Sequence, residues 1–223
     1  MSRYSEALSM KVWGDFACFT RPEFKTERVS YPIITPSAAR GVLESVFWKP
    51  EIAWQVREIV ALRRPSYFSV MRNEVNSLAS ERTARGWEQA GGKGGFFAPD
   101  DRTQRHTLAL RDVAYVIRAD IVLRPGVKDD PAKYRDQFRR RVERGQCAHM
   151  PYLGCREFTS SFAKAEGTEQ PADWSEPLGR MLLDMEYEPG TSGRGVPRFF
   201  DAAIEGGVLQ IPARPLGSGW VDA

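Results

Sequence analysis

Alternation of apolar and polar residues predicts strands at two places in the chain. Near the start, residues 7–13 place Leu8, Met10 and Val12 at every second position. Residues 113–123 repeat this pattern over a longer distance. The apolar face of that segment is formed by Val113, Tyr115, Ile117, Ala119, Ile121 and Leu123. Because a period of two turns one face of a strand toward a core, we expect both segments to be half-buried strands.

A first helix is marked by a start signal as well as by its period. Thr35 can cap it, Pro36 suits its first position, and Pro50 ends it. The apolar positions recur at helical spacing and are Ala39, Val42, Leu43 and Val46. We interpret the next run, residues 51–62, as a second helical segment that is bounded by Pro65.

A later helix carries an unusual number of basic residues. Asp130 caps it, Pro131 opens it and Gly145 closes it. Its apolar stripe consists of Tyr134, Phe138 and Val142. The basic residues around that stripe are Lys133, Arg135, Arg139, Arg140, Arg141 and Arg144. A basic strip on a single helix is more often a solvated face than a binding site. Here only four acidic residues balance it, which favours phosphate binding.

The other segments complete the order of elements. Residues 67–75 and 156–162 are expected to be strands, whereas residues 77–106 have little periodicity and contain a glycine run at 91–95. We therefore expect a long loop or loose hairpin there. After Pro171, short strands are expected at residues 181–187, 198–204 and 208–211.

This order predicts an α+β protein. Residues 1–165 are expected to form a ferredoxin-like (RRM-like) β-α-β-β-α-β domain, and residues 166–223 a small C-terminal antiparallel β-sheet. The fold hosts many functions, so it does not by itself assign one.

Composition adds a prediction about the environment of the protein. The chain is 42% hydrophobic and 27% charged, which is ordinary for a globular protein. No segment approaches the roughly 18 consecutive apolar residues of a membrane span, and the first residues lack a signal-peptide pattern. Its three cysteines are few and odd in number, which argues against a disulfide framework. We expect a soluble, cytoplasmic protein without membrane contact.

Charge is distributed unevenly along the chain. Residues 1–164 contain 28 Lys and Arg against 19 Asp and Glu, whereas residues 165–223 contain 4 against 10. A polyanion would be attracted to the first part and repelled by the second. The alternative is a basic region joined to an acidic one without any ligand.

Several kinds of chemistry lack support in the sequence. There are only two histidines, His106 and His149, and no cysteine pair has the spacing of a structural zinc site. Cys147, His149 and Cys155 form at best a partial metal site, and buried thiols are the simpler interpretation. The chain also lacks a phosphate-binding P-loop and a G-x-S-x-G nucleophile elbow. We expect neither a metal nor a cofactor.

Four short motifs resemble the CRISPR-associated Cas-five family of subtype I-C, and the resemblance runs from about residue 6 to about residue 212. They are Trp48-Lys49-Pro50 after Glu44-Ser45, Thr103-Gln104-Arg105, Arg111-Asp112-Val113 and Pro151-Tyr152-Leu153-Gly154-Cys155-Arg156-Glu157-Phe158. The last run is the most specific.

The resemblance implies a metal-independent endoribonuclease that cuts the repeat hairpin of precursor CRISPR RNA. Such a protein stays on the 5′ handle of the mature CRISPR RNA and joins the other subunits of a type I-C surveillance complex. Its reaction needs a base for the attacking ribose 2′-OH, a cation for the phosphorane charge and an acid for the leaving 5′-oxygen.

The resemblance also implies catalytic positions, and this sequence departs from two of them. Lys133 matches the family lysine, but Tyr134 replaces a histidine and Phe47 replaces a tyrosine. Tyr134 would be a poor base at pH 7 unless Lys133 lowered its pKa, and it could instead be a core tyrosine. His106 is the replacement base that we consider first, although it could be an ordinary loop histidine.

The expected site therefore combines catalytic and RNA-binding residues. Lys133, Tyr134 and His106 are the catalytic candidates. The RNA-binding candidates are Lys49, Arg105, Arg139, Arg140, Arg144 and Arg156. Two alternatives remain open, namely a non-catalytic subunit that only holds the 5′ handle and a surface for double-stranded DNA.

Overall fold

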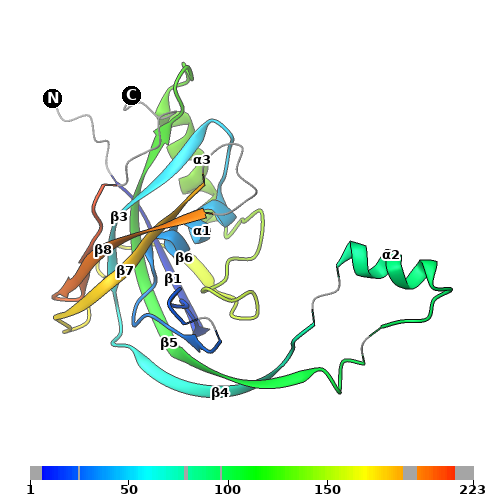
Figure 1. Ribbon diagram of the computed structural model, residues 1–223. Coiled ribbons are helices and arrows are strands. Elements are labelled where there is room, and N and C mark those ends of the chain that lie inside the picture. The colour runs from blue at the N-terminus through cyan, green and yellow to red at the C-terminus, as the bar shows by residue number, and fades with distance from the viewer. Residues whose placement is uncertain (1–6, 25, 78–79, 96, 188–194, 214–223) are drawn as a thin grey trace.

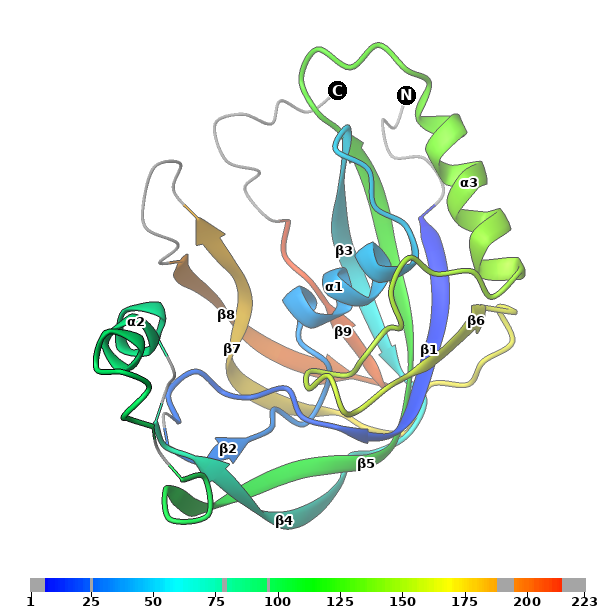
Figure 2. The same ribbon diagram turned by 90° about the vertical axis from the view of Figure 1, so that its right-hand side faces the viewer.

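A single sheet organises the protein. The structure is a computed structural model that describes residues 7–24, 26–77, 80–95, 97–187 and 195–213. Along the sheet the strands follow the order β6-β1-β5-β3-β9-β8-β7, and β2 and β4 also pair with β5 (Figure 1 and Figure 2). The elements are β1 (Leu8–Ala17), β2 (Arg28–Val29), α1 (Pro36–Val46), β3 (Ile52–Ala61), β4 (Ser66–Val75), α2 (Glu81–Gln89), β5 (Arg102–Leu123), α3 (Pro131–Glu143), β6 (Ser161–Lys164), β7 (Glu176–Tyr187), β8 (Gly195–Glu205) and β9 (Val208–Gln210). The pairing is antiparallel except between β2 and β5, so the expected α+β class is confirmed.

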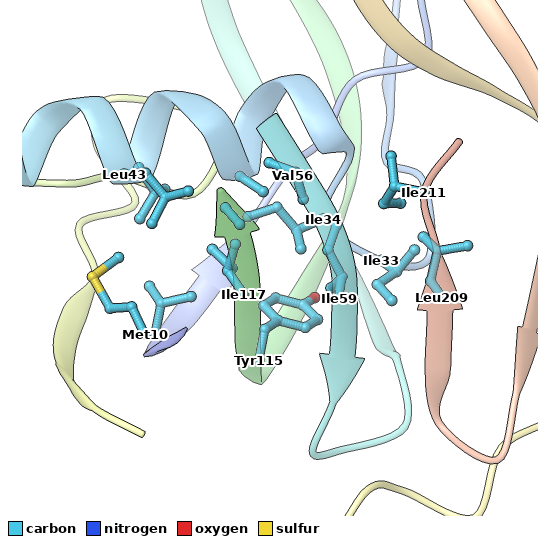
Figure 3. Packing of buried hydrophobic residues seen from close by; sticks show 14 of the residues in the cluster. Met10, Ile33, Ile34, Leu43, Val56, Ile59, Tyr115, Ile117, Leu209 and Ile211 are labelled. Carbon is cyan, nitrogen blue, oxygen red and sulfur yellow. The ribbon is translucent and has the colours of Figure 1, made fainter. Parts of the chain in front are cut away.

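Two helices cover one face of this sheet. α1 packs on β3 and β7, α3 packs on β1, β5 and β6, and the two helices also contact each other (Figure 2). The core beneath them combines side chains from distant segments, including Met10, Leu43, Ile59 and Ile117 (Figure 3). Within the described residues, no helix is long and apolar enough to cross a membrane.

Both predicted helix starts are confirmed. Thr35 accepts a hydrogen bond from the backbone of Ala38 at 3.3 Å, and Asp130 accepts one from Ala132 at 2.8 Å. Gly145 ends α3 with φ +63°, a conformation that glycine adopts without a steric penalty. The predicted apolar stripe of α3 is buried, and Phe138 packs edge-on against Trp54 of β3 with ring centroids 4.7 Å apart.

The prediction of a helix over residues 51–62 is wrong, because this segment is β3. A β-bulge between Val56 and Glu58 inserts one residue into the strand. Before the bulge, the buried hydrophobic residues Ile52, Trp54 and Val56 are two positions apart. Across the bulge, the next buried residue after Val56 is Ile59, three positions later. Ile52, Val56 and Ile59 together imitate a helical period. The segment is nevertheless a strand, because its backbone pairs with β5 on one side and with β9 on the other.

The long loop or loose hairpin expected over residues 77–106 is confirmed in part, as the end of a hairpin, but the segment has more structure than expected. It contains α2, whose first turn is capped by Ser80 accepting from Thr83 at 3.1 Å, and it contains the start of β5. β4 and the first half of β5 form a long hairpin that extends from the body and carries α2 near its tip (Figure 1). We call residues 66–111 the arm.

The last predicted strand of the first domain begins later than expected. The strand over residues 156–162 is replaced by β6, which starts at Ser161. The preceding residues 151–158 form a compact turn, which we call the 151–158 loop. In that loop Leu153 donates to the Phe158 carbonyl at 2.8 Å and Phe158 donates to the Cys155 carbonyl at 2.9 Å. These local bonds use backbone groups that a strand would need for pairing.

The three predicted C-terminal strands are confirmed as β7, β8 and β9. They are antiparallel to one another, and β9 pairs with β3, so they continue the main sheet. The division into domains at residues 165 and 166 stays a prediction.

Candidate nucleic-acid interface and reaction site

The residues that the sequence singled out lie in two separate regions. Lys49, Lys133 and Tyr134 lie near the C-terminal end of β5, where α3 begins, and Arg139, Arg140 and Arg144 follow along α3 to its other end. Arg105 and His106 lie on the arm, and Arg156 lies in the 151–158 loop beside the base of the arm.

The start of α3 brings Lys133 and Tyr134 onto one carboxylate. Oδ2 of Asp129 accepts a hydrogen bond from the Tyr134 hydroxyl at 2.6 Å and from Lys133 Nζ at 2.9 Å. Lys133 Nζ also lies 5.3 Å from the centroid of the Tyr134 ring. Because Asp130 is the helix cap, Asp129 directly precedes it and residues of the first turn can reach back to it. We call these three residues the helix-start cluster.

Asp129 controls the protonation of this cluster. The hydrogen bond from Tyr134, supported by Lys133, lowers the pKa of the Asp129 carboxyl. The same hydrogen bond raises the pKa of Tyr134 to about 12, since loss of the phenol proton would leave two negative charges in contact. The sequence suggested that Lys133 could lower this pKa. In the structure, Asp129 opposes that effect and keeps the phenol protonated.

A second segment approaches the helix-start cluster from the α1–β3 turn. Backbone N–H of Arg124 donates to the Glu51 carbonyl at 2.9 Å, and the Glu51 carboxylate contributes to the raised pKa of Tyr134. Trp48 is 55% exposed in this turn and Lys49 is exposed beside it. The structure therefore brings the turn that carries Lys49 to the same edge as the start of α3.

Phe47 has a structural place in that turn. Its ring is fully buried, its carbonyl accepts from the indole of Trp54 at 2.8 Å, and the Arg141 guanidinium lies 5.4 Å from its ring centroid. Arg141 also donates to the Val46 carbonyl at 2.8 Å. Arg141 therefore ties α3 to α1, and the solvent-facing basic strip of α3 is narrower than the sequence suggested.

The predicted RNA-binding arginines of α3 do face solvent. Arg139, Arg140 and Arg144 are all exposed, and Arg139 forms an ion pair with Asp136 at 3.4 Å. For the side chains of Arg140 and Arg144, the described residues contain no hydrogen-bond or ion-pair partner. Both guanidinium groups can therefore reach a phosphate without losing an internal partner.

At the base of the arm, arginines that the sequence analysis missed join the predicted ones. Arg105 donates to the Thr26 carbonyl at 3.0 Å and pairs with Glu74 at 3.4 Å. Arg28 pairs with the same Glu74 at 3.2 Å. Arg72 pairs with Glu157 next to the exposed Arg156. Arg28 and Arg72 carry no local signal in the sequence, because their grouping depends on pairing between distant segments.

His106 and Lys133 are not brought together. His106 is exposed on the arm opposite Met71, whereas α3 begins beyond the far end of β5 at Leu123. At about 3.3 Å per residue, on the order of 50 Å of strand separates His106 from that end. One phosphate cannot contact both residues in this arrangement.

In the part of the chain that the structure describes, no group of three or more His, Cys, Asp or Glu side chains is placed to hold a metal ion. Cys155 lies beside Cys18 rather than beside Cys147. The partial metal site considered from the sequence is therefore not assembled among these residues.

The family described as "CRISPR-associated protein (Cas_Cas5)" matches residues 7–212, so the chain belongs to this family. The motif-based identification is thereby confirmed. A protein of Thermus thermophilus named "CRISPR pre-crRNA endoribonuclease Cas5d" is 46% identical, with 92% of this chain and 91% of that protein aligned. A protein of the same name from Mannheimia succiniciproducens is 39% identical, over 92% of this chain and 94% of that protein.

Two solved structures share the fold. A structure titled "Crystal Structure of CRISPR-associated Protein" has a TM-score of 0.67 and 21% identity, and covers 96% of this chain and 95% of its own. A functionally uncharacterized protein from Streptococcus mutans has a TM-score of 0.66 and 18% identity, over 97% and 96% of the two chains. At these identities the likeness concerns the fold alone.

Proposed function

We propose that this chain is an endoribonuclease that binds precursor CRISPR RNA and cuts its repeat hairpin. The observation that carries the proposal is the similarity over nine-tenths of the chain to two proteins named as pre-crRNA endoribonucleases. The exposed arginines of α3 supply the cations that such a substrate requires.

The proposed reaction is metal-independent attack of a ribose 2′-OH on the adjacent phosphate, which gives a 2′,3′-cyclic phosphate and a 5′-OH. Lys133 stabilises the negative charge that develops on the phosphorane. Tyr134, protonated and held by Asp129, is suited to donate a proton to the leaving 5′-oxygen. Tyr134 thus acts as the proton donor, and the proton of the attacking 2′-OH passes to solvent water. His106 is the competing candidate for proton transfer on the arm.

The proposed framework for this site is a ferredoxin-like core. It consists of β1, α1, β3, β5, α3 and β6, and its strands lie in the order β6-β1-β5-β3 with both helices on one face. The order of these elements along the chain is β-α-β-β-α-β. This core places the start of α3 and the α1–β3 turn at a single edge.

After cleavage, the protein is proposed to stay on the 5′ handle of mature CRISPR RNA within a cytoplasmic type I-C surveillance complex. A non-catalytic role in the same complex is the second candidate. It is favoured by one observation, the buried Phe47 at a family tyrosine position, because a phenyl ring cannot transfer a proton.

The decisive experiment is incubation of the purified protein with its cognate repeat RNA in EDTA. The expected products end in a 2′,3′-cyclic phosphate and a 5′-OH. Cleavage that disappears in EDTA and returns with magnesium would contradict the mechanism. Binding without cleavage under either condition would support the non-catalytic role. Competition between repeat RNA and duplex DNA at equal salt tests the DNA-binding alternative.

Two single variants separate the catalytic candidates. Lys133→Ala should slow single-turnover cleavage about 100-fold while changing RNA affinity much less, because one preorganised charge donor is removed. Lys164→Ala, an exposed lysine paired with Glu143 at the other end of α3, is the matched control. His106→Ala should cut at the wild-type rate if Tyr134 transfers the proton, and a large loss would instead place the reaction at the arm.

A further inference from the structure

Two cysteines meet at the base of the arm and have no part in the proposed cleavage. Cys18 follows β1, Cys155 lies in the 151–158 loop, and both are buried in one small apolar cluster with Ala109 and Phe158. A polar group also lies near each sulfur atom. Sγ of Cys18 lies 3.6 Å from Thr20 Oγ1, and Sγ of Cys155 accepts from Arg28 Nη1 at 3.8 Å.

The backbone holds the two cysteines against each other. The N–H of Cys18 donates to the Leu153 carbonyl at 3.0 Å. A Cβ atom at Gly154 would lie 2.0 Å from the Cys18 carbonyl oxygen, and Gly154 has φ +86°, so only glycine fits at this contact. The backbone of the 151–158 loop therefore packs directly against the backbone of Cys18. These backbone contacts bring residues 18 and 155 into one cluster.

The surroundings of the pair favour a thiolate. A hydrogen bond with Cys155, together with Thr20 and the positive charges of Arg28 and Arg72, lowers the pKa of the Cys18 thiol to about 6 despite burial. The pKa of Cys155 is raised, first by the same hydrogen bond. The same hydrogen bond therefore favours the thiolate at Cys18 and the thiol at Cys155. A thiolate is the form of cysteine that reacts with peroxides and disulfides.

We propose that Cys18 and Cys155 are a reversible oxidation site at which a peroxide converts the two thiols into a disulfide. The deprotonated sulfur attacks one peroxide oxygen, the O–O bond breaks, and the departing oxygen takes up a proton to leave as water. The resulting sulfenic acid is attacked by the second sulfur, which gives up its proton. The S–O bond breaks, a second water leaves, and the S–S bond forms. Both sulfurs are oxidised and the peroxide is reduced.

The disulfide joins the end of β1 to the 151–158 loop, beside the arginines at the base of the arm. It removes the thiolate from the neighbourhood of Arg28 and closes a covalent loop between residues 18 and 155. Oxidation should therefore raise the midpoint of thermal unfolding. Cys147 serves as an internal reference, because it packs at the edge of the main core rather than with this pair.

The test uses the folded full-length protein and hydrogen peroxide. After quenching and denaturation, free thiols are labelled with N-ethylmaleimide and counted by intact mass. The reduced chain should take three labels, one for each cysteine. The oxidised chain should take one label, weigh two hydrogens less before labelling, and recover all three labels after dithiothreitol. A peptide that links residue 18 to residue 155 should appear after proteolysis.

Matched variants assign the bond. Oxidised Cys147→Ser should take no label, whereas Cys18→Ser and Cys155→Ser should each keep two. The label count on the wild-type chain tests the proposal even where a cysteine variant fails to fold. Three labels after peroxide treatment, a bond through Cys147, a disulfide between two chains, or a mass gain from sulfinic acid would each overturn the proposal. None of these outcomes depends on whether the protein cleaves RNA.

Discussion

Asp129 gives Tyr134 a chemistry that its residue type alone does not define. A phenol beside an ammonium would be expected to lose its proton more readily, yet the carboxylate between the two groups accepts hydrogen bonds from both. The result is a cluster in which the carboxylate is charged and the phenol is protonated at neutral pH. At this scale the function of a residue depends on its direct neighbours.

The first prediction tests directly whether Asp129 sets the pKa of Tyr134. Asp129→Asn should lower the pKa of Tyr134 from about 12 toward its ordinary value near 10, because the negative acceptor is lost. NMR titration of the protein with labelled tyrosine rings measures the change. Asp136→Asn is the control, since Asp136 pairs with Arg139 and not with a tyrosine. An unchanged midpoint for Tyr134 would mean that Asp129 does not set its pKa.

The second prediction concerns stability and pH. The folded pKa of Asp129 is lowered, so its contribution is present above the unfolded value of about 3.9 and is lost as pH falls through the folded value. The folded pKa of Tyr134 is raised, so its contribution is present below about 10 and is lost as pH rises toward about 12. The difference in unfolding free energy between wild type and Asp129→Asn should stay constant between about pH 5 and 9 and shrink on both sides. Urea unfolding measures it, and a difference independent of pH would contradict the interaction.

At the scale of elements, β3 is the joint between the two parts of the sheet. Its backbone pairs with β5 on one side and with β9 on the other. Hydrogen bonds of Gly207 in the β8–β9 turn strengthen this connection. The Gly207 carbonyl accepts from the Ala61 N–H at 2.8 Å, and the Gly207 N–H donates to the Trp174 carbonyl at 2.7 Å. A change at Gly207 therefore tests how the C-terminal strands are held.

The third prediction compares two glycines. Gly207→Ala should destabilise the protein by about 2 kcal/mol or more, because φ is +79° and the new Cβ would lie 2.5 Å from the Ala172 carbonyl oxygen. Gly41→Ala in α1 should instead stabilise it by about 0.5 to 1 kcal/mol, since nothing lies within 4 Å of that Cβ. Chemical unfolding measures both, and equal effects would contradict the backbone geometry.

The fourth prediction concerns the arm. Among its described residues, α2 has no buried side chain, and Val75 and Arg102 are direct partners in the β4–β5 register. Replacing residues 76–101 by an Asn-Gly turn should therefore close the hairpin without disturbing the body. The midpoint of thermal unfolding should change by no more than about 2 °C, because little packing is removed. A fall of many degrees would mean that the tip stabilises the body.

At the scale of the whole molecule, charge is separated between the two sides. α3, which carries the exposed Arg139, Arg140 and Arg144, lies on the side opposite β7 and β8 (Figure 2). β7 and β8 contain five Asp and Glu against two Arg. This arrangement orients a polyanion toward α3 and away from the C-terminal strands. The measurable consequence is the dependence of binding on salt.

The fifth prediction uses that dependence. Replacing Arg139, Arg140 and Arg144 by alanine should weaken RNA binding and reduce the slope of log affinity against log salt by about 0.7 to 0.9 for each lost contact. As a control, replacing Arg63, Arg180 and Arg198 by alanine removes the same charge elsewhere. This variant should leave the slope of log affinity against log salt nearly unchanged. Equal slopes for the two triple variants would mean that α3 does not face the RNA.

Elements whose causes are local could be predicted from the amino-acid sequence. The caps at Thr35 and Asp130 fixed the starts of α1 and α3, and strict alternation identified β1 and the second half of β5. The motif at residues 151–158 pointed to the family. Each of these features depends on residues within a few positions of one another, so no distant partner was needed.

Features that depend on pairing between distant segments could not be predicted in this way. β3 imitates a helical period because of its bulge, and it is a strand because residues 208–210 and 115–123 pair with it. The separation of His106 from Lys133 follows from the length of β5, and the contact of Cys18 with Cys155 follows from the packing of a loop onto the end of β1. The physical reason is common to all three. Register and packing are set by contacts between segments that lie far apart in the sequence. Local periodicity carries no information about those contacts.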